Sequence, residues 1–106
     1  MDAELLFAPE AAQDVAEAYS WYEARCLTLG EEYLRCVEAC LASLCHVPDG
    51  HPAVHSVFRR ALVRRFPYAV FYEHRGEQVI VYAVFHTARD PGKWRVRLEG
   101  GITGGR

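Results

Sequence analysis

The spacing of apolar residues divides the chain into a helical first part and a strand-rich second part. A short apolar run over residues 3–8 predicts a strand, and Pro9 followed by Glu10 is typical of a first helical turn. Apolar side chains then recur at three- and four-residue spacing to about Cys26, which predicts an amphipathic helix. Its apolar face would comprise Val15, Tyr19, Tyr22 and Cys26, and its water-facing side Gln13, Asp14, Glu17 and Glu23.

A second helix is predicted to begin at Thr28 and to end near Val47. Thr28 and Glu31 have the spacing of a capping box, in which each side chain bonds to the other residue's backbone amide. The helix must stop near Val47 because the prolines and glycine of residues 48–52 follow. Its core stripe would be Leu34, Val37, Leu41 and Leu44. The first half of the chain therefore predicts a helical hairpin.

After His55 the pattern changes to alternating or continuous β-branched and aromatic residues, which indicates strands. We predict strands at residues 56–66, 68–74 and 78–86, with a turn at 75–77. The order β-α-α-β-β-β predicts an α+β fold, a helical hairpin packed on a mostly antiparallel four-stranded sheet. Residues 1–99 would form one domain, and the glycine-rich residues 100–106 a flexible tail.

Length and composition favour a single domain with a surface site. The chain has 106 residues, of which 51% are hydrophobic, and this is too few to enclose a large cofactor cavity, so no cofactor is expected. The acidic start, MDAELLFAPE, lacks the features of a secretory signal, and the longest apolar run, Val79 to Phe85, is far too short to cross a bilayer. We therefore expect a cytoplasmic protein with no membrane association.

The net charge of -2 hides a strong asymmetry between the halves. Residues 1–54 hold ten acids and two arginines, a net charge of -8, whereas residues 55–106 hold ten bases and four acids, a net charge of +6. One interpretation is that the second half meets an anionic partner, either nucleic acid or an acidic protein segment. The alternative is that the two halves attract each other across the fold.

Four arginines in the predicted strand 56–66 are candidates for contact with such a partner. Strand alternation would place Arg59 and Arg65 on one face and Arg60 and Arg64 on the other. They would form either a functional basic stripe or merely a solvated edge.

The segment that follows the last predicted strand carries the strongest catalytic candidate. His86 titrates near neutrality and could act as acid or base on a ribose hydroxyl, with nearby arginines stabilising charge on a phosphate. The alternative is that His86 hydrogen-bonds Asp90 and fixes the turn while Trp94 seals the core. No phosphate-binding glycine loop, serine nucleophile motif or pair of metal-binding carboxylates is present in the sequence.

The four cysteines are expected to be reduced and mostly buried. Three of them lie within ten residues of a predicted helix, and nothing in the sequence signals an oxidising compartment. A zinc site built from Cys36, Cys40, Cys45 and His46 is the alternative. The paired CxxC motif of a zinc knuckle is missing, so we predict no metal and small apolar thiols.

Four stretches together resemble the RelE/ParE superfamily of bacterial toxins, often called plasmid-stabilisation proteins. They are PEAAQDVAEAYSWYE, LGEEYLRCVEACLASLCHVPDGHP, FRRALVRRFPYAVFYE and VIVYAVFHTARDPGKW, and the likeness covers Ala3 to about Arg97. The resemblance implies a growth-inhibiting cytoplasmic toxin of a type II toxin-antitoxin system, neutralised by an antitoxin whose acidic or amphipathic segment wraps it. It also implies one of two targets, DNA gyrase or ribosome-bound mRNA, and assembly as a homodimer or a toxin-antitoxin hetero-oligomer.

The resemblance is closer to the ParE-like group than to the ribonuclease branch. Where that branch has arginines, this sequence has Ala69 and Thr87, and its terminal tyrosine has no clear counterpart. If the chain is an enzyme, the resemblance implies a metal-independent, ribosome-dependent endoribonuclease with His86, Arg89 and Arg65 in the catalytic roles. Residues expected to contact a partner or phosphate are Arg59, Arg60, Arg64, Arg65, Arg89 and Lys93. The rival hypothesis is a non-toxic, decayed family member that acts as a peptide-binding module.

Overall fold

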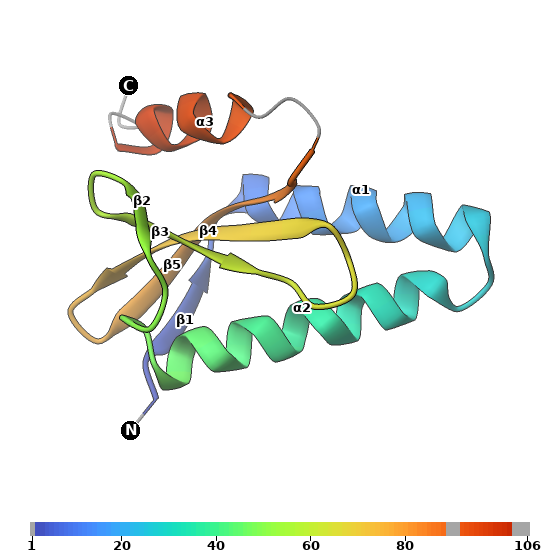
Figure 1. Ribbon diagram of the computed structural model, residues 1–106, viewed down its shortest axis with the longest axis horizontal. Coiled ribbons are helices and arrows are strands. Elements are labelled where there is room, and N and C mark those ends of the chain that lie inside the picture. Colours follow the sequence, from blue (N-terminus) through green and yellow to red (C-terminus); the bar gives the residue numbers. More distant parts are fainter. Residues whose placement is uncertain (1, 89–91, 103–106) are drawn as a thin grey trace.

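Five strands form one sheet in the order β1-β5-β4-β3-β2, with helices on both faces. The computed structural model describes residues 2–88 and 92–102 (Figure 1). Its elements are β1 (Glu4–Phe7), α1 (Pro9–Arg25), α2 (Leu29–His46), β2 (Ala53–His55), β3 (Phe58–Leu62), β4 (Tyr68–Arg75), β5 (Gln78–His86) and α3 (Lys93–Ile102). Strand β1 pairs parallel with β5, and the other neighbours are antiparallel. The predicted α+β fold with a helical hairpin is confirmed, with five strands rather than four.

The predicted capping box at Thr28 is wrong. Thr28 has a left-handed backbone, with φ of 70°, and its side chain makes no cap hydrogen bond. The Glu23 carboxylate of α1 instead accepts hydrogen bonds from the amides of Thr28 and Gly30, at 2.9 Å each. Gly30 allows this close approach, since a Cβ there would lie 2.8 Å from both the Tyr19 carbonyl oxygen and the Glu23 carboxylate. The hairpin turn is therefore fixed by a carboxylate from the preceding helix.

The predicted strand 56–66 is also corrected. The structure has two short strands, β2 and β3, and Ser56 lies between them with a φ of 54°. Strand β3 ends at Leu62, and Arg65 in the following turn has a φ of 72°. Arg64 and Arg65 are therefore turn residues, and the predicted alternation of four arginines along one strand does not occur.

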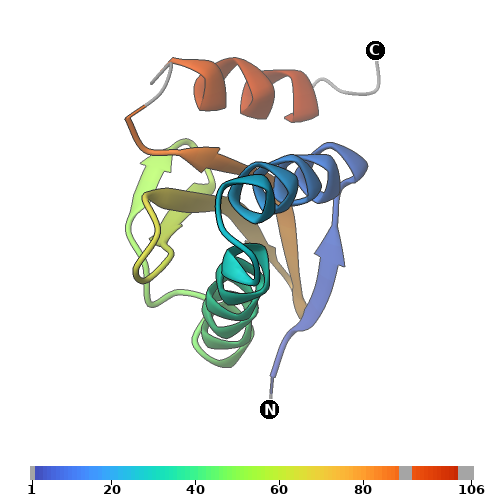
Figure 2. The ribbon, with the colours of Figure 1, turned by 90° about the vertical axis from the view of Figure 1, so that its right-hand side faces the viewer.

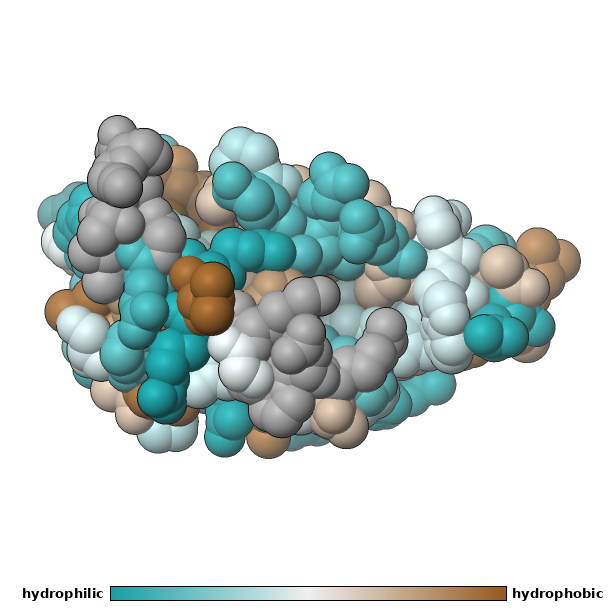
Figure 3. Space-filling model, turned by 90° about the horizontal axis from the view of Figure 1, so that it is seen from above, coloured by the Kyte–Doolittle hydropathy of each residue, from teal (hydrophilic) through white to brown (hydrophobic). Residues whose placement is uncertain are grey.

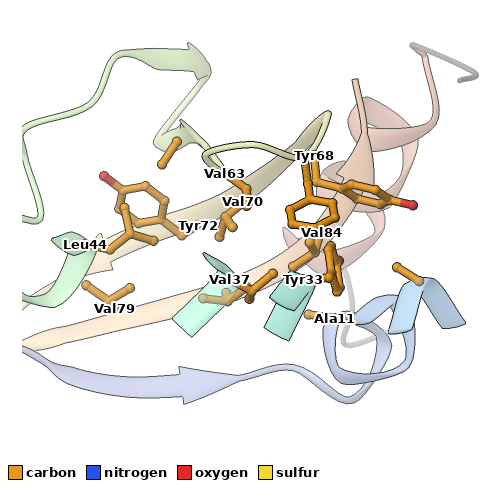
Figure 4. Packing of buried hydrophobic residues seen from close by; sticks show 14 of the residues in the cluster. Ala11, Tyr33, Val37, Leu44, Val63, Tyr68, Val70, Tyr72, Val79 and Val84 are labelled. Atoms are coloured by element: carbon orange, nitrogen blue, oxygen red, sulfur yellow. The ribbon is translucent and has the colours of Figure 1, made fainter. Parts of the chain in front are cut away.

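The larger core cluster lies between the sheet and the α1–α2 hairpin. It includes the fully buried Tyr33, Leu44, Val70, Tyr72 and Val79 (Figure 4). All four residues of the stripe predicted for α2 pack in or against this cluster. Figure 2 shows α1 and α2 nearly end-on, with α3 lying apart from them across the top of the molecule.

A second, smaller cluster lies between the opposite face of the sheet and α3. Leu98 of α3 is fully buried there with Phe58, Ala69 and Phe71, and the Trp94 ring stacks on Phe71 with centroids 5.0 Å apart. The interpretation that Trp94 seals the core is thus confirmed, although the helix that carries it was not predicted. Over this face the surface is mostly hydrophilic, with hydrophobic areas small and separate (Figure 3).

The glycine-rich end of the chain is partly helical. Helix α3 runs to Ile102, into the segment 100–106 expected to be a flexible tail, and residues 103–106 lie outside the described residues. No helix in the described part of the chain is long and apolar enough to cross a membrane.

Candidate functional site

A β-bulge in β5 decides which way its last residues face. Phe71 pairs with Ala83 and Tyr72 pairs with Val81, so Tyr82 is an extra residue with no partner in β4. Because an extra residue reverses the alternation of a strand, Val84 turns to the same face as Val79 and Val81, the side of the α1–α2 hairpin. His86, which pairs with Tyr68, follows the same alternation. The bulge therefore brings His86 to the α1 side of the sheet.

The second half of β5 has no described neighbouring strand on the edge that faces away from β4, and side chains bind its backbone there instead. Strand β1 ends at Phe7, opposite Val81, and no described strand continues along this edge. The Asp14 carboxylate of α1 accepts a hydrogen bond from the Val84 amide at 3.0 Å, and the Arg97 guanidinium of α3 donates to the Tyr82 carbonyl at 3.1 Å. The two side chains also bind each other at 3.0 and 3.2 Å. They thus tie α1, β5 and α3 together.

An open cleft of about 630 Å³ lies at this junction. Its lining residues are Glu10, Gln13, Asp14, Glu17, Ala18, Trp21, Tyr68, Val84, Phe85, His86 and Arg97. Among the described lining residues there are three carboxylates and one guanidinium, and that guanidinium is already bound to Asp14. The lining also includes the rings of Trp21, Tyr68 and Phe85, and Trp21 is 46% exposed. The cleft is acidic and aromatic, which suits a cation better than an anion.

His86 is positioned by the chain next to it and by Tyr68. The Ala88 amide donates a hydrogen bond to Nδ1 of His86 at 3.1 Å, and the His86 ring lies 5.2 Å from the Tyr68 ring, edge-on. The alternative hydrogen bond to Asp90 falls outside the described residues. His86 lies in the cleft as a catalytic residue would, and the described lining residues around it include three carboxylates and Arg97.

Two of the predicted arginines, Arg59 and Arg65, lie away from His86 and bind other partners. The Arg59 guanidinium donates to the His51 carbonyl at 2.6 Å and lies 3.6 Å from Asp49. Arg65 binds Glu32 of α2 at 2.9 Å, and this ion pair raises the pKa of Arg65. Neither residue lines the cleft.

The remaining predicted contact residues are exposed or undescribed. Arg60 on β3 and Arg64 in the turn are exposed and form no ion pair with a described residue. Arg89 lies outside the described residues. Lys93 begins α3, and its side chain is likewise not described.

Ion pairs join acidic residues of the first half of the chain to basic residues of the second half, and they neutralise part of the opposite charges of the two halves. Asp14 binds Arg97, Glu32 binds Arg65, and Asp49 binds both Arg59 and His74. The hydrogen bond from His74, at 2.9 Å, is the main cause of a lowered pKa at Asp49. The interpretation that the halves attract each other is therefore supported, and Arg60 and Arg64 remain as basic groups open to a partner.

The four cysteines are free thiols, of which Cys45 is buried and Cys26 is exposed. Cys40 is half-buried beside the Leu62 carbonyl, and burial raises the pKa of its thiol to about 11. Burial likewise raises the pKa of Cys45. Within residues 2–88 and 92–102, no three His, Cys, Asp or Glu side chains converge as a metal site would require.

Comparison with known proteins decides the family. The model of the "ParE toxin of type II toxin-antitoxin system, parDE" family matches residues 5–91. The chain belongs to the ParE toxin family. A search of curated protein sequences finds no match for this ParE-family chain.

Two solved structures share the fold of this ParE-family chain. The "Chromosomal ParDE TA system from P. aeruginosa" gives a TM-score of 0.71 at 16% identity, over 79% of this chain and 95% of that chain. Toxin RelE of E. coli, an arginine double mutant in the free state, gives 0.64 at 15% identity, over 93% of this chain and 97% of that chain. At these identities the likeness shows the fold alone.

This ParE-family sequence has Ala69 and Thr87 where the ribonuclease branch is expected to have arginines, and in this structure both residues stabilise the fold. Ala69 is 1% exposed, against Phe58 and Leu98 in the cluster under α3, so an arginine there would displace the helix. The backbone amide and hydroxyl of Thr87 both donate to the Pro67 carbonyl, at 2.8 and 3.3 Å.

Most residues of the cleft were not found from the sequence. Asp14 and Glu17 were assigned to the water-facing side of the first helix, yet the Asp14 side chain is only 10% exposed. Arg97 lay in a segment with no predicted element. The one signal available was the proximity of His86 to the end of an apolar strand, and it located the cleft without revealing its acidic wall.

Proposed function

We propose that this ParE-family chain is the toxin of a type II toxin-antitoxin pair that arrests growth by inhibiting DNA gyrase, and that a cognate antitoxin neutralises it. The observation that carries the choice of target is the acidic lining of the cleft around His86. A ribonuclease needs a base, an acid and a positive site for the scissile phosphate. Here the described residues that line the cleft together with His86 carry a net negative charge.

The carboxylates of the cleft would repel the phosphates of an RNA chain. A carboxylate about 4 Å from a phosphate opposes binding by about 1 kcal/mol in water and by about 4 kcal/mol at the effective dielectric near a protein surface. Glu10 and Glu17 line the cleft without an ion pair to a described residue, so their charges are not neutralised there. An RNA backbone would meet these charges before it reached His86.

The exposed arginines suit a role in antitoxin binding. Arg60 and Arg64 project from β3 and the turn after it, where an acidic segment could contact both. Rim charges of this kind steer association and make it salt-dependent. Charge reversal at Arg60 should therefore weaken antitoxin binding more at low salt than at high salt.

The test is controlled expression of the wild type and of His86→Ala, followed by two assays. We expect growth arrest and loss of supercoiling by purified gyrase, with no new transcript ends, and we expect His86→Ala to change the inhibition less than threefold. If the chain were a nuclease, loss of the base would slow cleavage at least about a hundredfold.

Two results would contradict the proposal. Codon-specific cuts with unimpaired supercoiling would assign the chain to the ribonuclease branch. Antitoxin binding without any growth arrest would favour the non-toxic binding module instead.

A further inference from the structure

The cleft between α1, β5 and α3 already holds one guanidinium, and that contact shows what its walls can bind. Two nitrogens of Arg97 lie on the Asp14 carboxylate, one also donates to the Tyr82 carbonyl, and the group lies 4.6 Å from the centre of the Phe85 ring. A carboxylate, a carbonyl and an aromatic face are the combination that binds a planar cation.

The outer part of the same cleft is lined by Glu10, Gln13, Glu17 and Trp21, and the described lining residues include no lysine or arginine besides Arg97. Glu10 and Glu17 are seven residues apart on α1, which is about two helical turns, so both carboxylates lie on the face that borders the cleft. The Gln13 amide donates to Glu17 at 3.1 Å and leaves the carboxylate's charge unneutralised. Neither glutamate has an ion pair with a described residue, so two negative charges remain for a ligand.

The aromatic walls of this outer part are suited to a cation as well. Arg25 lies over the Trp21 ring at 4.1 Å from its centre, so one face of that indole already binds a guanidinium. Trp21 is nevertheless 46% exposed, and Tyr68 forms the inner wall.

A fully buried hydroxyl lies in the core next to Tyr68, the residue that forms the inner wall of the cleft. The Tyr33 ring lies 5.1 Å from the Tyr68 ring, and the two are neighbours at one end of the core (Figure 4). The Tyr33 hydroxyl is the one buried side-chain polar atom of the described residues that has no hydrogen-bond partner. Burial raises its pKa, and the charge of Asp14 in the cleft contributes to that rise. Tyr33 itself does not line the cleft, so its hydroxyl lies in the core behind the wall that Tyr68 forms.

We propose that the outer cleft binds an arginine side chain, flanked by apolar residues, from a segment of the antitoxin. The guanidinium lies between the carboxylates of Glu10 and Glu17 and against the rings of Trp21 and Tyr68. Arginine fits better than lysine because its planar group stacks on rings while it donates to carboxylates. The assignment to the antitoxin rests on the proposed function, whereas binding of the arginine does not.

The first experiment measures the site alone. An end-blocked Leu-Arg-Leu peptide is titrated into the isotope-labelled protein, with the uncharged citrulline analogue and a Leu-Glu-Leu peptide as controls. We expect the arginine peptide to shift the Trp21 indole signal and the amides of residues 10–17. The citrulline peptide should bind at least about fivefold more weakly, and 0.5 M salt should weaken the arginine peptide by a similar factor, since exposed ion pairs are screened.

Variants then locate the binding. Glu10→Gln combined with Glu17→Gln should weaken the arginine peptide about five- to tenfold, because both ion pairs to the guanidinium are lost. Glu38→Gln, on an exposed part of α2 outside the cleft lining, is the matched control and should change nothing. Equal binding of arginine and citrulline peptides, shifts outside the cleft, or no effect of the double variant would overturn the site.

A second experiment identifies the partner. The double variant should lose affinity for the cognate antitoxin while it keeps its inhibition of gyrase, and its sedimentation should match the wild type. Loss of gyrase inhibition with intact antitoxin binding would place the arginine in the target, and a change from dimer to monomer would place it in a second copy. Either result overturns the assignment to the antitoxin and leaves the proposed function unchanged. Conversely, the growth and supercoiling assays can contradict the proposed function even if the arginine peptide binds the cleft.

Discussion

The two halves of β5 are held in place by different means. From Gln78 to Val81 the strand lies between β1 and β4, and backbone hydrogen bonds occupy both of its edges. From Ala83 to His86 it pairs only with β4, and the other edge is held by Asp14 and Arg97. Figure 4 shows the same division in the core, with Leu44, Tyr72 and Val79 at one end and Tyr33, Tyr68 and Val84 at the other.

This difference explains where the cleft lies. A paired strand satisfies its own backbone and leaves no polar group for a ligand, whereas an edge held by side chains leaves space between them. The cleft opens along the second half, and its lining comes from three separate elements, α1, β5 and α3, together with Tyr68 of β4. The candidate site thus lies beside the bulged half of β5.

The largest expected effect comes from breaking the Asp14–Arg97 contact. Asp14→Ala leaves the Val84 amide without its acceptor and the partly buried Arg97 without its counter-charge, so we expect a loss of about 2–4 kcal/mol in the free energy of unfolding. Urea denaturation measures it. Glu17→Ala on the same helix, whose carboxylate accepts only from Gln13 in the described part of the chain, should cost less than about 0.5 kcal/mol. Equal losses in the two variants would mean that the edge is not held by Asp14.

The sequence predicted the first half of β5 and its surroundings better than the second half. Apolar periodicity located α1, α2, β1, β4 and β5 because each buries one face or both, and Gln78–His86 was predicted with its observed bounds. It did not locate β2, and it predicted β3 as part of a longer strand. The bulge at Tyr82 and the contact between Asp14 and Arg97 could not be predicted, since both depend on partners far apart in the sequence. Helix α3 was missed because its glycines and few apolar positions give no helical pattern, although Trp94 and Leu98 anchor it on the sheet.

The second effect tests how α3 is attached to the second half. Trp94→Ala removes the stack on Phe71 and should cost about 1–3 kcal/mol, less than a fully buried tryptophan because the ring is only half-buried. We expect faster proteolytic cleavage within α3 as well as lower stability in urea. Trp21→Ala, at an exposed position, is the control and should leave the cleavage rate unchanged. Unchanged cleavage in Trp94→Ala would show that Arg97 and Leu98 suffice to hold the helix.

A smaller effect is expected at Cys40, on the side of α2 that faces β3. Its pKa is raised from 9.0 to about 11 by burial, so the unfolded chain ionises first as the pH rises. The stability that this thiol contributes is therefore present below about pH 9 and is lost between pH 9 and pH 11, by about 1–2 kcal/mol. Urea denaturation of the wild type and Cys40→Ala across this range measures the difference between them. A difference that does not change with pH would contradict the burial of the thiol.

The smallest change in stability is expected at Tyr33, at the end of the core beside the cleft. Tyr33→Phe removes a hydroxyl that is buried without a hydrogen-bond partner, so no favourable contact is lost and the cost of desolvating that group disappears. We expect the free energy of unfolding to rise by up to about 1 kcal/mol. Tyr72→Phe at the other end of the core is the matched comparison. The Tyr72 hydroxyl donates to the Pro48 carbonyl at 2.6 Å, and its loss should lower stability by about 1 kcal/mol. We therefore expect Tyr33→Phe to raise the free energy of unfolding and Tyr72→Phe to lower it. A loss of stability in both variants would mean that the Tyr33 hydroxyl has a hydrogen-bond partner in solution.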